Sequence, residues 1–306
     1  MPTLSPAEMD ELFGVDALCE AATLAPGHPD VPPKDESFAF SEEATQAILE
    51  GFNSQRWVLL HGPPGVGKSS HVEQVAARLN WPTLRINLDG HLTRADLVGR
   101  DQVRVEDGVP TTAFCPGLMV WALTRPVALI LDEYDAGRPD VMFVLQQVLE
   151  QGGKLTLLEE NKVLTPHPQF RLFATANTVG GGDISGMYSG TQVLNQAQLD
   201  RWPIVVEMAY LPAEQESQLL TRKVAGLDPQ LAQRMVSLAG FIRKAHAQGD
   251  LAVQCSLRTL LAWAESTVNT GKPELGFMWA YGHRCESPDR VLVRELYQRC
   301  MGRELS

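Results

Sequence analysis

The segment GPPGVGKS (62–69) places glycines, a lysine and a hydroxyl at the spacing G-x-x-x-x-G-K-[ST] of a phosphate-binding loop. Glycines let main-chain N–H groups face phosphate oxygens, and the N-terminus of a following helix attracts the same anion. We expect Lys68 to reach the β- and γ-phosphates of ATP and the Ser69 hydroxyl to bind Mg²⁺. The alternative is a glycine turn without a ligand, which the apolar segment before the loop and the helical pattern after it disfavour. The candidate nucleotide-binding residues are Gly62, Pro63, Pro64, Gly65, Val66, Gly67, Lys68, Ser69 and Ser70.

Two adjacent carboxylates end the apolar segment VALILDEYD (127–135). A carboxylate at the C-terminal end of a strand beside a phosphate-binding loop can hold Mg²⁺ through its water ligands, which is the role we expect of Asp132. The neighbouring Glu133 can orient and activate an attacking water. The pair favours hydrolysis of the nucleotide over binding alone, and the alternative is an acidic turn.

Three further polar side chains have the type and position to contact a transferred phosphoryl group. Asn177 ends the apolar segment LFATANT, where its amide could position water; the alternative is a turn residue. Arg201 precedes another apolar segment, and an arginine that stabilises phosphoryl charge can come from a second subunit. Arg258 lies near the start of a C-terminal helix, from which it could reach the γ-phosphate. The alternatives are a surface Arg201 paired with Asp200 and a solvated Arg258.

Short apolar segments and helical patterns alternate over the part of the chain that carries these residues. The segments are almost continuously apolar, as expected of parallel strands covered on both faces. Alternating strands and helices predict an α/β fold with a parallel sheet. The expected strands are 56–61, 83–88, 127–132, 170–176 and 203–208, and the clearest helices are 68–80 and 138–151.

Two segments predict hairpins inserted into this α/β fold. In 101–114, Asp107-Gly108 lies between two alternating runs, and in 153–167 two β-like runs flank polar residues. From residue 212 onward only helical patterns occur. We therefore expect three parts, which are an N-terminal segment with a Pro-rich linker (1–36), a nucleotide-binding α/β domain (37–210) and a helical lid domain (211–306).

Composition narrows the class of protein. The 306 residues carry a formal net charge of −11, which disfavours a nucleic-acid partner because phosphate contacts need clustered lysines and arginines. None of the five cysteines has zinc-site spacing. The N-terminus lacks the pattern of a signal peptide, and no run of 18 apolar residues predicts a membrane span. We expect a cytoplasmic protein with reduced cysteines.

The order of the five chemical elements resembles that of the AAA+ ATPases. By that resemblance, Asn177 is the sensor 1 residue, Arg201 the arginine finger and Arg258 the sensor 2 residue. The resemblance implies a P-loop core with helices on both faces of its sheet, a helical lid, and a homo-oligomeric ring, mostly a hexamer, with ATP between subunits. The two hairpins stand where the MoxR and magnesium-chelatase branch carries its insertions.

Four longer stretches resemble the CobS family, the ATPase subunits of aerobic cobaltochelatase. The similarity runs from about Phe38 to the C-terminus and covers stretches without any role in ATP binding; Pro63, Pro64 and Val66 depart from the usual loop of that family. The resemblance implies ATP hydrolysis that drives Co²⁺ insertion into hydrogenobyrinic acid a,c-diamide. The implied partners are a CobT-like subunit and a large CobN-like subunit that holds the corrin. The stretches are 71–101, 132–150, 154–180 and 190–212.

Two other hypotheses remain open from the sequence. A MoxR-type chaperone or remodelling ATPase would share the ATP site and act on a protein partner with a von Willebrand-like domain. A nucleic-acid motor is disfavoured by the net charge and by the lack of a basic, aromatic stripe. Neighbouring corrin-pathway genes would distinguish the chelatase from the remodelling ATPase.

Overall fold

A computed structural model describes residues 2–15, 20–106, 109–150, 152–178 and 196–305. Its contacts divide the chain into two compact units. The first unit comprises Met1–Lys34, Phe40–Gly62 and Gly67–Met208. The second unit comprises Asp35–Ala39, Pro63–Val66 and Ala209–Ser306. The tip of the phosphate-binding loop therefore groups with the C-terminal helices, although the residues on both sides of it belong to the first unit.

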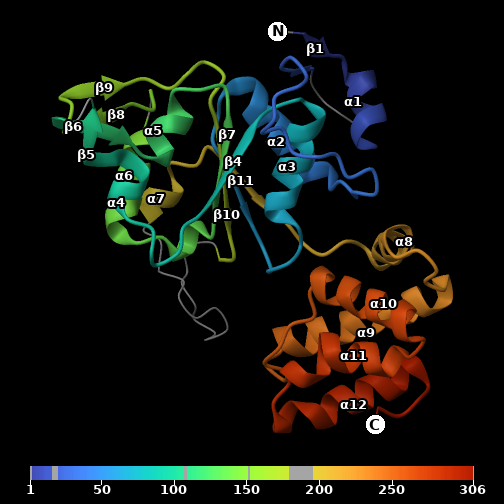
Figure 1. Cartoon of the computed structure of the whole chain (residues 1–306). Coiled ribbons are helices and arrows are strands. Elements are labelled where there is room, and N and C mark those ends of the chain that lie inside the picture. Colours follow the sequence, from blue (N-terminus) through green and yellow to red (C-terminus); the bar gives the residue numbers. More distant parts are fainter. Residues whose placement is uncertain (1, 16–19, 107–108, 151, 179–195, 306) are drawn as a thin grey trace. The chain divides into compact units, whose positions relative to one another are not determined.

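The first unit is built on a parallel sheet with the strand order β11-β3-β10-β7-β4 (Figure 1). All residues of β7 and β10 are buried, which explains why their sequences are mostly apolar rather than alternating. Strand β10 pairs with both β3 and β7, so the carboxyl ends of these three strands are neighbours at one edge of the sheet. The strands are β3 (Val58–His61), β4 (Thr83–Asn87), β7 (Ala128–Asp132), β10 (Arg171–Ala176) and β11 (Ile204–Glu207).

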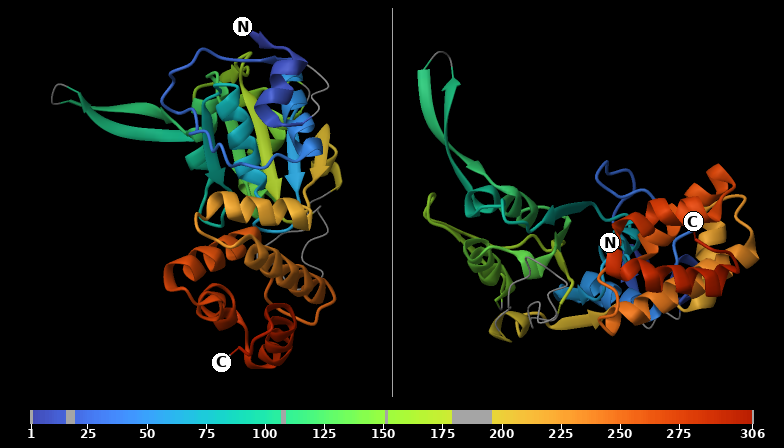
Figure 2. Two further views of the ribbon diagram at one scale, coloured as in Figure 1. Left: turned by 90° about the vertical axis from the view of Figure 1, so that its right-hand side faces the viewer. Right: turned by 90° about the horizontal axis from the view of Figure 1, so that it is seen from below.

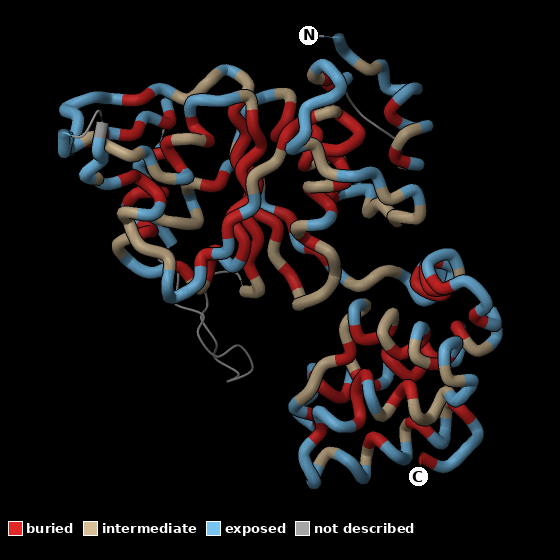
Figure 3. Tube along the Cα trace, in the orientation of Figure 1, coloured by how far each residue is buried: buried red, intermediate tan, exposed pale blue. Residues whose placement is uncertain are grey.

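Helices cover both faces of this sheet, with α2 and α3 on one face and α4, α5 and α6 on the other (Figure 1). Burial is concentrated along the strands and the helix faces that meet them (Figure 3). This is the α/β architecture that the sequence predicts. The helices of the first unit are α1 (Pro6–Phe13), α2 (Glu42–Ser54), α3 (Lys68–Arg78), α4 (Arg94–Val98), α5 (Leu118–Leu123), α6 (Pro139–Leu149) and α7 (Gln196–Leu199), with a 3₁₀ turn η1 (Tyr134–Ala136).

The described part of the N-terminal segment packs within the first unit. Strands β1 (Thr3–Leu4) and β2 (Ala21–Ala22) pair antiparallel. The Arg78 side chain of α3 donates to the Leu12 carbonyl at 3.2 Å. In the Pro-rich stretch, the Pro33 carbonyl accepts from the Gln74 side chain at 3.0 Å. The segment that the sequence predicts as a linker is thus hydrogen-bonded to helix α3 up to this point.

Both predicted hairpins are present. Strands β5 (Gly99–Glu106) and β6 (Val109–Pro116) form a long antiparallel pair that projects from the sheet of the first unit (Figure 2). Strands β8 (Leu155–Leu157) and β9 (Lys162–Leu164) form the second, shorter pair. The predicted turn Asp107-Gly108 lies outside the described residues.

The second unit is helical around its own core. An aromatic cluster forms its centre, with the ring of Phe277 4.9 Å from those of Trp263 and Tyr297. No helix in the described ranges is both long and apolar enough to cross a bilayer. Its elements are α8 (Ala213–Lys223), α9 (Pro229–Ala247), α10 (Leu257–Thr270), α11 (Pro273–Ala280), η2 (Gly282–Arg284) and α12 (Ser287–Met301).

Candidate active site

The predicted loop lies between β3 and α3, at the carboxyl edge of the sheet. Gly62 has a φ of 145°, and a Cβ there would lie 2.1 Å from the Met208 carbonyl oxygen, so only glycine fits. Gly67, with a φ of 93°, is the N-cap of α3. Lys68 and Ser69 therefore occupy the first turn of the helix, where main-chain N–H groups and the helix dipole favour an anion.

Asp132 ends β7 and is directed at this loop. Its Oδ1 accepts hydrogen bonds from the Ser69 hydroxyl and, at 2.8 Å, from the Thr175 hydroxyl of β10. Its Oδ2 is paired with the Arg85 guanidinium of β4. The carboxylate is buried, so these partners replace the water that it would otherwise bind. The structure thus brings together Ser69 and Asp132, the two residues that the sequence assigns to Mg²⁺.

Glu133 has a left-handed backbone, with φ 56° and ψ 46°, and an exposed side chain. A residue other than glycine adopts this conformation at a cost of roughly 1 to 3 kcal/mol, and such residues cluster at functional sites. The sharp turn lets the chain leave the sheet immediately after Asp132. It places one carboxylate in the buried network and the next in solvent.

Lys68 and Asn177 meet at the same edge. The Lys68 ammonium donates to the Asn177 amide oxygen at 3.0 Å and to the Gly62 carbonyl at 2.7 Å. Burial lowers the pKa of Lys68 to about 8, although the carboxylates of Asp135, Asp132 and Glu133 act in the opposite direction. A desolvated, charged amine held at the loop is suited to replace its lost hydration with phosphate oxygens.

Asp135 belongs to this site and was not among the residues that the sequence singled out. It is fully buried, and its Oδ2 accepts from the main-chain N–H groups of Asn177 (3.0 Å) and Thr178 (2.9 Å) and from the Thr178 hydroxyl (2.9 Å). It therefore fixes the segment that carries Asn177 to the turn after β7. The sequence signal was a third carboxylate two residues after Glu133, which is indistinguishable from a turn residue before the fold is known.

Arg85 was also missed. It lies in β4, and besides Asp132 it pairs with Glu73 of α3 at 3.6 Å. Sequence reasoning treated β4 only as an apolar strand. Strand β4 pairs with β7, and this pairing brings the Arg85 side chain to Asp132.

Arg201 lies at the opposite edge of the same sheet. It precedes β11, and its guanidinium pairs with Glu150 (2.6 Å to Oε1) rather than with Asp200. A pocket of about 760 Å³ opens there, lined by residues that include Trp57, Phe170 and Pro203, each of which directly precedes a strand of the sheet. Strands of four to six residues span roughly 13–20 Å, so Arg201 is separated from the loop of its own subunit by the length of the sheet.

Arg258 lies in the first turn of α10 in the second unit and is exposed. Its helix is capped by Ser256, whose hydroxyl accepts from the Thr259 N–H at 3.2 Å. The structure therefore assembles Lys68, Ser69, Asp132 and Asn177 at one edge of the sheet. It places Arg201 at the other edge of the sheet and Arg258 in the second unit.

The fold and the site define a class of protein. Residues 57–193 match the family model of the AAA domain (dynein-related subfamily), and residues 216–275 match the CbbQ/NirQ/NorQ C-terminal model. The fold is similar to that of a RuvB mutant from Thermotoga maritima, with a TM-score of 0.51 at 13% identity, covering 87% of this chain and 74% of that one. The chain is an AAA ATPase with a nucleotide-binding domain.

The similarity to individual proteins narrows this class. The chain is 48% identical over 299 residues to the aerobic cobaltochelatase subunit CobS of Sinorhizobium sp, covering 96% of this chain and 90% of that protein. It is 28% identical over 219 residues to the protein CbbQ of Hydrogenophilus thermoluteolus, covering 70% of this chain and 74% of that one. The chain belongs to the CobS family of cobaltochelatase ATPase subunits.

Proposed function

We propose that this chain hydrolyses ATP to drive the insertion of Co²⁺ into a corrin ring, hydrogenobyrinic acid a,c-diamide. The observation that carries the proposal is the contact of the Ser69 hydroxyl with Asp132, beside the exposed Glu133, in a chain 48% identical to CobS. In P-loop ATPases a loop serine or threonine and a strand-end aspartate hold Mg²⁺ in this way. The proposed domain organisation is an N-terminal segment (1–36), a nucleotide-binding domain (37–210) and a helical lid (211–306).

The oxygen donors at the loop fit Mg²⁺. The Ser69 hydroxyl and the Asp132 carboxylate lie within hydrogen-bond distance of each other, and both are the hard ligands that this ion prefers. In this proposal Ser69 binds the ion directly and Asp132 binds it through water. When bound, Mg²⁺ neutralises charge on the β- and γ-phosphates.

The other side chains divide the remaining work. Lys68 binds the phosphates through its ammonium group. Glu133, exposed and next to Asp132, takes the proton of the attacking water. Asn177, held through Asp135, orients that water against the γ-phosphate. The proposed role of Arg258 is to contact the γ-phosphate from the lid.

Arg201 completes the site of a neighbouring subunit in a ring, which we propose to be a hexamer. Its position at the edge of the sheet opposite the loop supports action in trans, because a residue there is remote from the nucleotide of its own subunit. The proposed partners of the ring are a CobT-like subunit with a von Willebrand-like domain and a large CobN-like subunit. The proposed compartment is the cytoplasm.

The remodelling alternative is less well supported. Identity to CobS is 48% across both units, whereas identity to CbbQ is 28% over a shorter part of the chain. We therefore keep the chelatase motor as the single proposed function.

Steady-state ATP hydrolysis tests the catalytic assignment. Replacing Glu133 by Gln preserves the size of the side chain and removes the base, so turnover should fall at least about 100-fold while ATP binding is kept. The control is Lys68→Ala, which should lose binding as well. A Glu133→Gln protein that hydrolyses ATP at the wild-type rate would contradict the assignment.

A further inference from the structure

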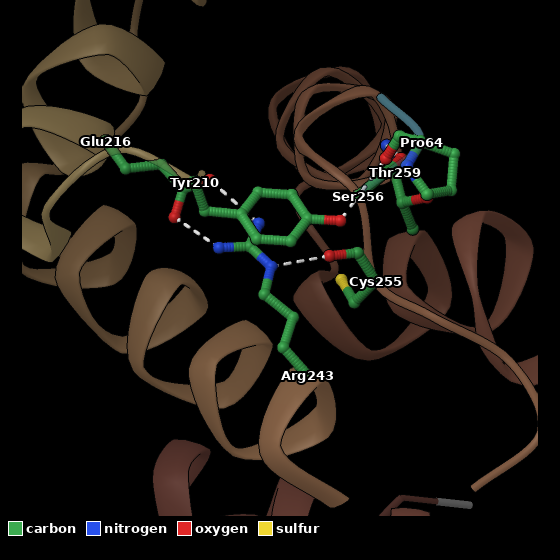
Figure 4. A network of polar contacts seen from close by, with 7 residues as sticks. All are labelled: Pro64, Tyr210, Glu216, Arg243, Cys255, Ser256 and Thr259. Carbon is green, nitrogen blue, oxygen red and sulfur yellow. Dashed lines mark hydrogen bonds and ion pairs between the residues drawn. The ribbon is translucent and has the colours of Figure 1, made fainter. Parts of the chain in front are cut away.

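The tip of the phosphate-binding loop is held by a tyrosine of the second unit. The Tyr210 hydroxyl donates to the Pro64 carbonyl at 3.2 Å (Figure 4). The chain has no cis peptide bonds in its described part, and in a trans peptide the C=O and the following N–H point in opposite directions. Fixing the Pro64 carbonyl therefore also fixes the direction of the Gly65 N–H.

The Gly65 N–H matters in this loop because the residues before it offer no free main-chain donor. The N–H of Gly62 donates to the Ala176 carbonyl at 3.2 Å, within the first unit. Pro63 and Pro64 have no N–H at all. Gly65 thus carries the first main-chain donor of the loop tip, and main-chain donors are what such a loop offers to phosphate.

Tyr210 is itself held by an ion pair whose carboxylate is buried (Figure 4). The Arg243 guanidinium lies 3.6 Å from the centre of the Tyr210 ring, a cation–π contact. Two nitrogens of Arg243 donate to the two carboxylate oxygens of Glu216, both at 2.8 Å, and its Nε donates to the Cys255 carbonyl at 2.7 Å. All three guanidinium nitrogens donate hydrogen bonds, which fixes the plane on which the Tyr210 ring stacks.

The loop tip also contacts the start of helix α10. A Cβ on Gly65, whose φ is 74°, would lie 2.6 Å from the Ser256 Cβ. Ser256 is the N-cap of α10, and Arg258 follows two residues later. Gly65 is therefore packed against the cap of the helix that carries Arg258, while the preceding carbonyl is held by Tyr210.

We propose that Tyr210, held by the Glu216–Arg243 pair, is a positioning residue for nucleotide binding, a proposal that rests on the proposed ATP site. It orients the Gly65 N–H toward phosphate in a loop that two prolines have deprived of donors. The same contacts tie the loop tip to the first turn of α10. Tyr210 thereby compensates for the main-chain N–H groups that Pro63 and Pro64 lack.

The test compares two tyrosine-to-phenylalanine variants in the full chain. Tyr210→Phe removes the hydroxyl and keeps the ring under Arg243. Tyr281→Phe is the matched control, because its hydroxyl donates to the Val253 carbonyl at 2.6 Å inside the same unit. The dissociation constant (Kd) of a fluorescent ATP analogue is measured by anisotropy, the melting temperature (Tm) by circular dichroism, and KM and kcat by ATP hydrolysis.

We expect Tyr210→Phe to raise the Kd and the KM by about 3- to 10-fold, the effect of one neutral hydrogen bond, with kcat within about twofold. Tyr281→Phe should leave the Kd unchanged even if it lowers the Tm. An unchanged Kd in Tyr210→Phe, or an equal rise in Tyr281→Phe, overturns the inference. If wild-type protein binds ATP independently of Lys68, both the inference and the proposed site fail.

A double-mutant cycle tests the ion pair. Arg243→Lys keeps the charge but loses the two-pronged pairing and the stacking on the ring. If Arg243 acts through the Tyr210 hydroxyl, Arg243→Lys should raise the Kd, and Tyr210→Phe combined with it should raise the Kd no further than the larger single effect. If the two substitutions raise the Kd independently, so that their fold-changes multiply in the double variant, Arg243 does not act through the Tyr210 hydroxyl.

Discussion

Lys68 illustrates how burial prepares a single residue for its ligand. Its ammonium is buried, and it donates to the carbonyl oxygen of Gly62 and to the amide oxygen of Asn177. Phosphate oxygens would restore the hydration that burial removes. The pKa of about 8 follows mainly from this burial, which outweighs the nearby carboxylates.

The pKa of Lys68 gives a pH dependence of ATP binding. Below pH 8 the free protein already carries the charge that phosphate requires. As the pH rises through about 8, the free protein loses this proton, so binding must recover it, and the Kd for ATP should rise by up to about tenfold per pH unit. Anisotropy titrations between pH 7.5 and about 9.5 check this, with circular dichroism as a control for folding. A constant Kd across the range would contradict the expected protonation.

Residue types predicted most of the residues that the structure brings together at the candidate site, but not Asp135 and Arg85, which hydrogen-bond to them. Gly62, Lys68, Ser69 and Asp132 have motif positions whose chemistry depends on local spacing, and the structure brings the last three together with Asn177. Asp135 and Arg85 act through partners distant in sequence, at Thr178 and Asp132. Their roles follow from the strand order, which spacing along the chain does not reveal.

At the scale of elements, Asp135 joins the turn after β7 to the end of β10. The two strands are adjacent and parallel, so their carboxyl ends need a fixed separation for Asn177 to meet Lys68. Three hydrogen bonds to the buried Asp135 Oδ2 fix this separation.

Removing this connection should destabilise the protein. Asp135→Ala leaves two main-chain N–H groups and one hydroxyl of the Asn177–Thr178 segment without their acceptor, which should cost about 2–4 kcal/mol in the free energy of unfolding. Asp89→Ala is a matched control, since its exposed carboxylate also accepts from two N–H groups, those of His91 and Leu92. Urea denaturation followed by circular dichroism compares the two. An equal loss of unfolding free energy in both variants would contradict the expectation that the buried Asp135 contributes more than the exposed Asp89.

The pattern of apolar segments predicted the elements well because burial on both faces of a parallel sheet leaves a direct mark on sequence. Alternating apolar and polar residues on both sides of a turn predicted the two hairpins, because such alternation is typical of paired strands with one exposed face. Neither pattern predicted that Pro63–Val66 would group with the C-terminal helices. That grouping depends on Tyr210 and Ser256, which lie about 150 and 190 residues away in a chain whose motifs gave no sign of them.

At the scale of the whole molecule, the two edges of the sheet support the proposed ring. The candidate nucleotide-binding residues lie at the carboxyl edge, and Arg201 lies at the amino edge beside Glu150. A single subunit cannot bring both to one phosphate through a rigid sheet. A ring in which the amino edge of one subunit faces the carboxyl edge of the next resolves this.

Mixing two inactive variants tests this arrangement. Arg201→Ala should abolish turnover with ATP binding kept, and Lys68→Ala should abolish binding. In mixed rings, an intact loop on the first variant can meet an intact arginine on the second, so some hydrolysis should return. Mixing Arg201→Ala with the Arg201→Ala, Lys68→Ala double variant is the control and should give none. Full activity of Arg201→Ala by itself would refute the role in trans.

Cobalt insertion in a reconstituted system tests the central claim most directly. The chain is combined with CobT-like and CobN-like subunits, hydrogenobyrinic acid a,c-diamide, Co²⁺, Mg²⁺ and ATP, and the corrin spectrum is followed. We predict that cobalt enters the ring with the wild-type chain and not with Glu133→Gln, which still binds ATP. Cobalt insertion at the wild-type rate by Glu133→Gln would contradict the account that ATP hydrolysis by this chain drives the reaction.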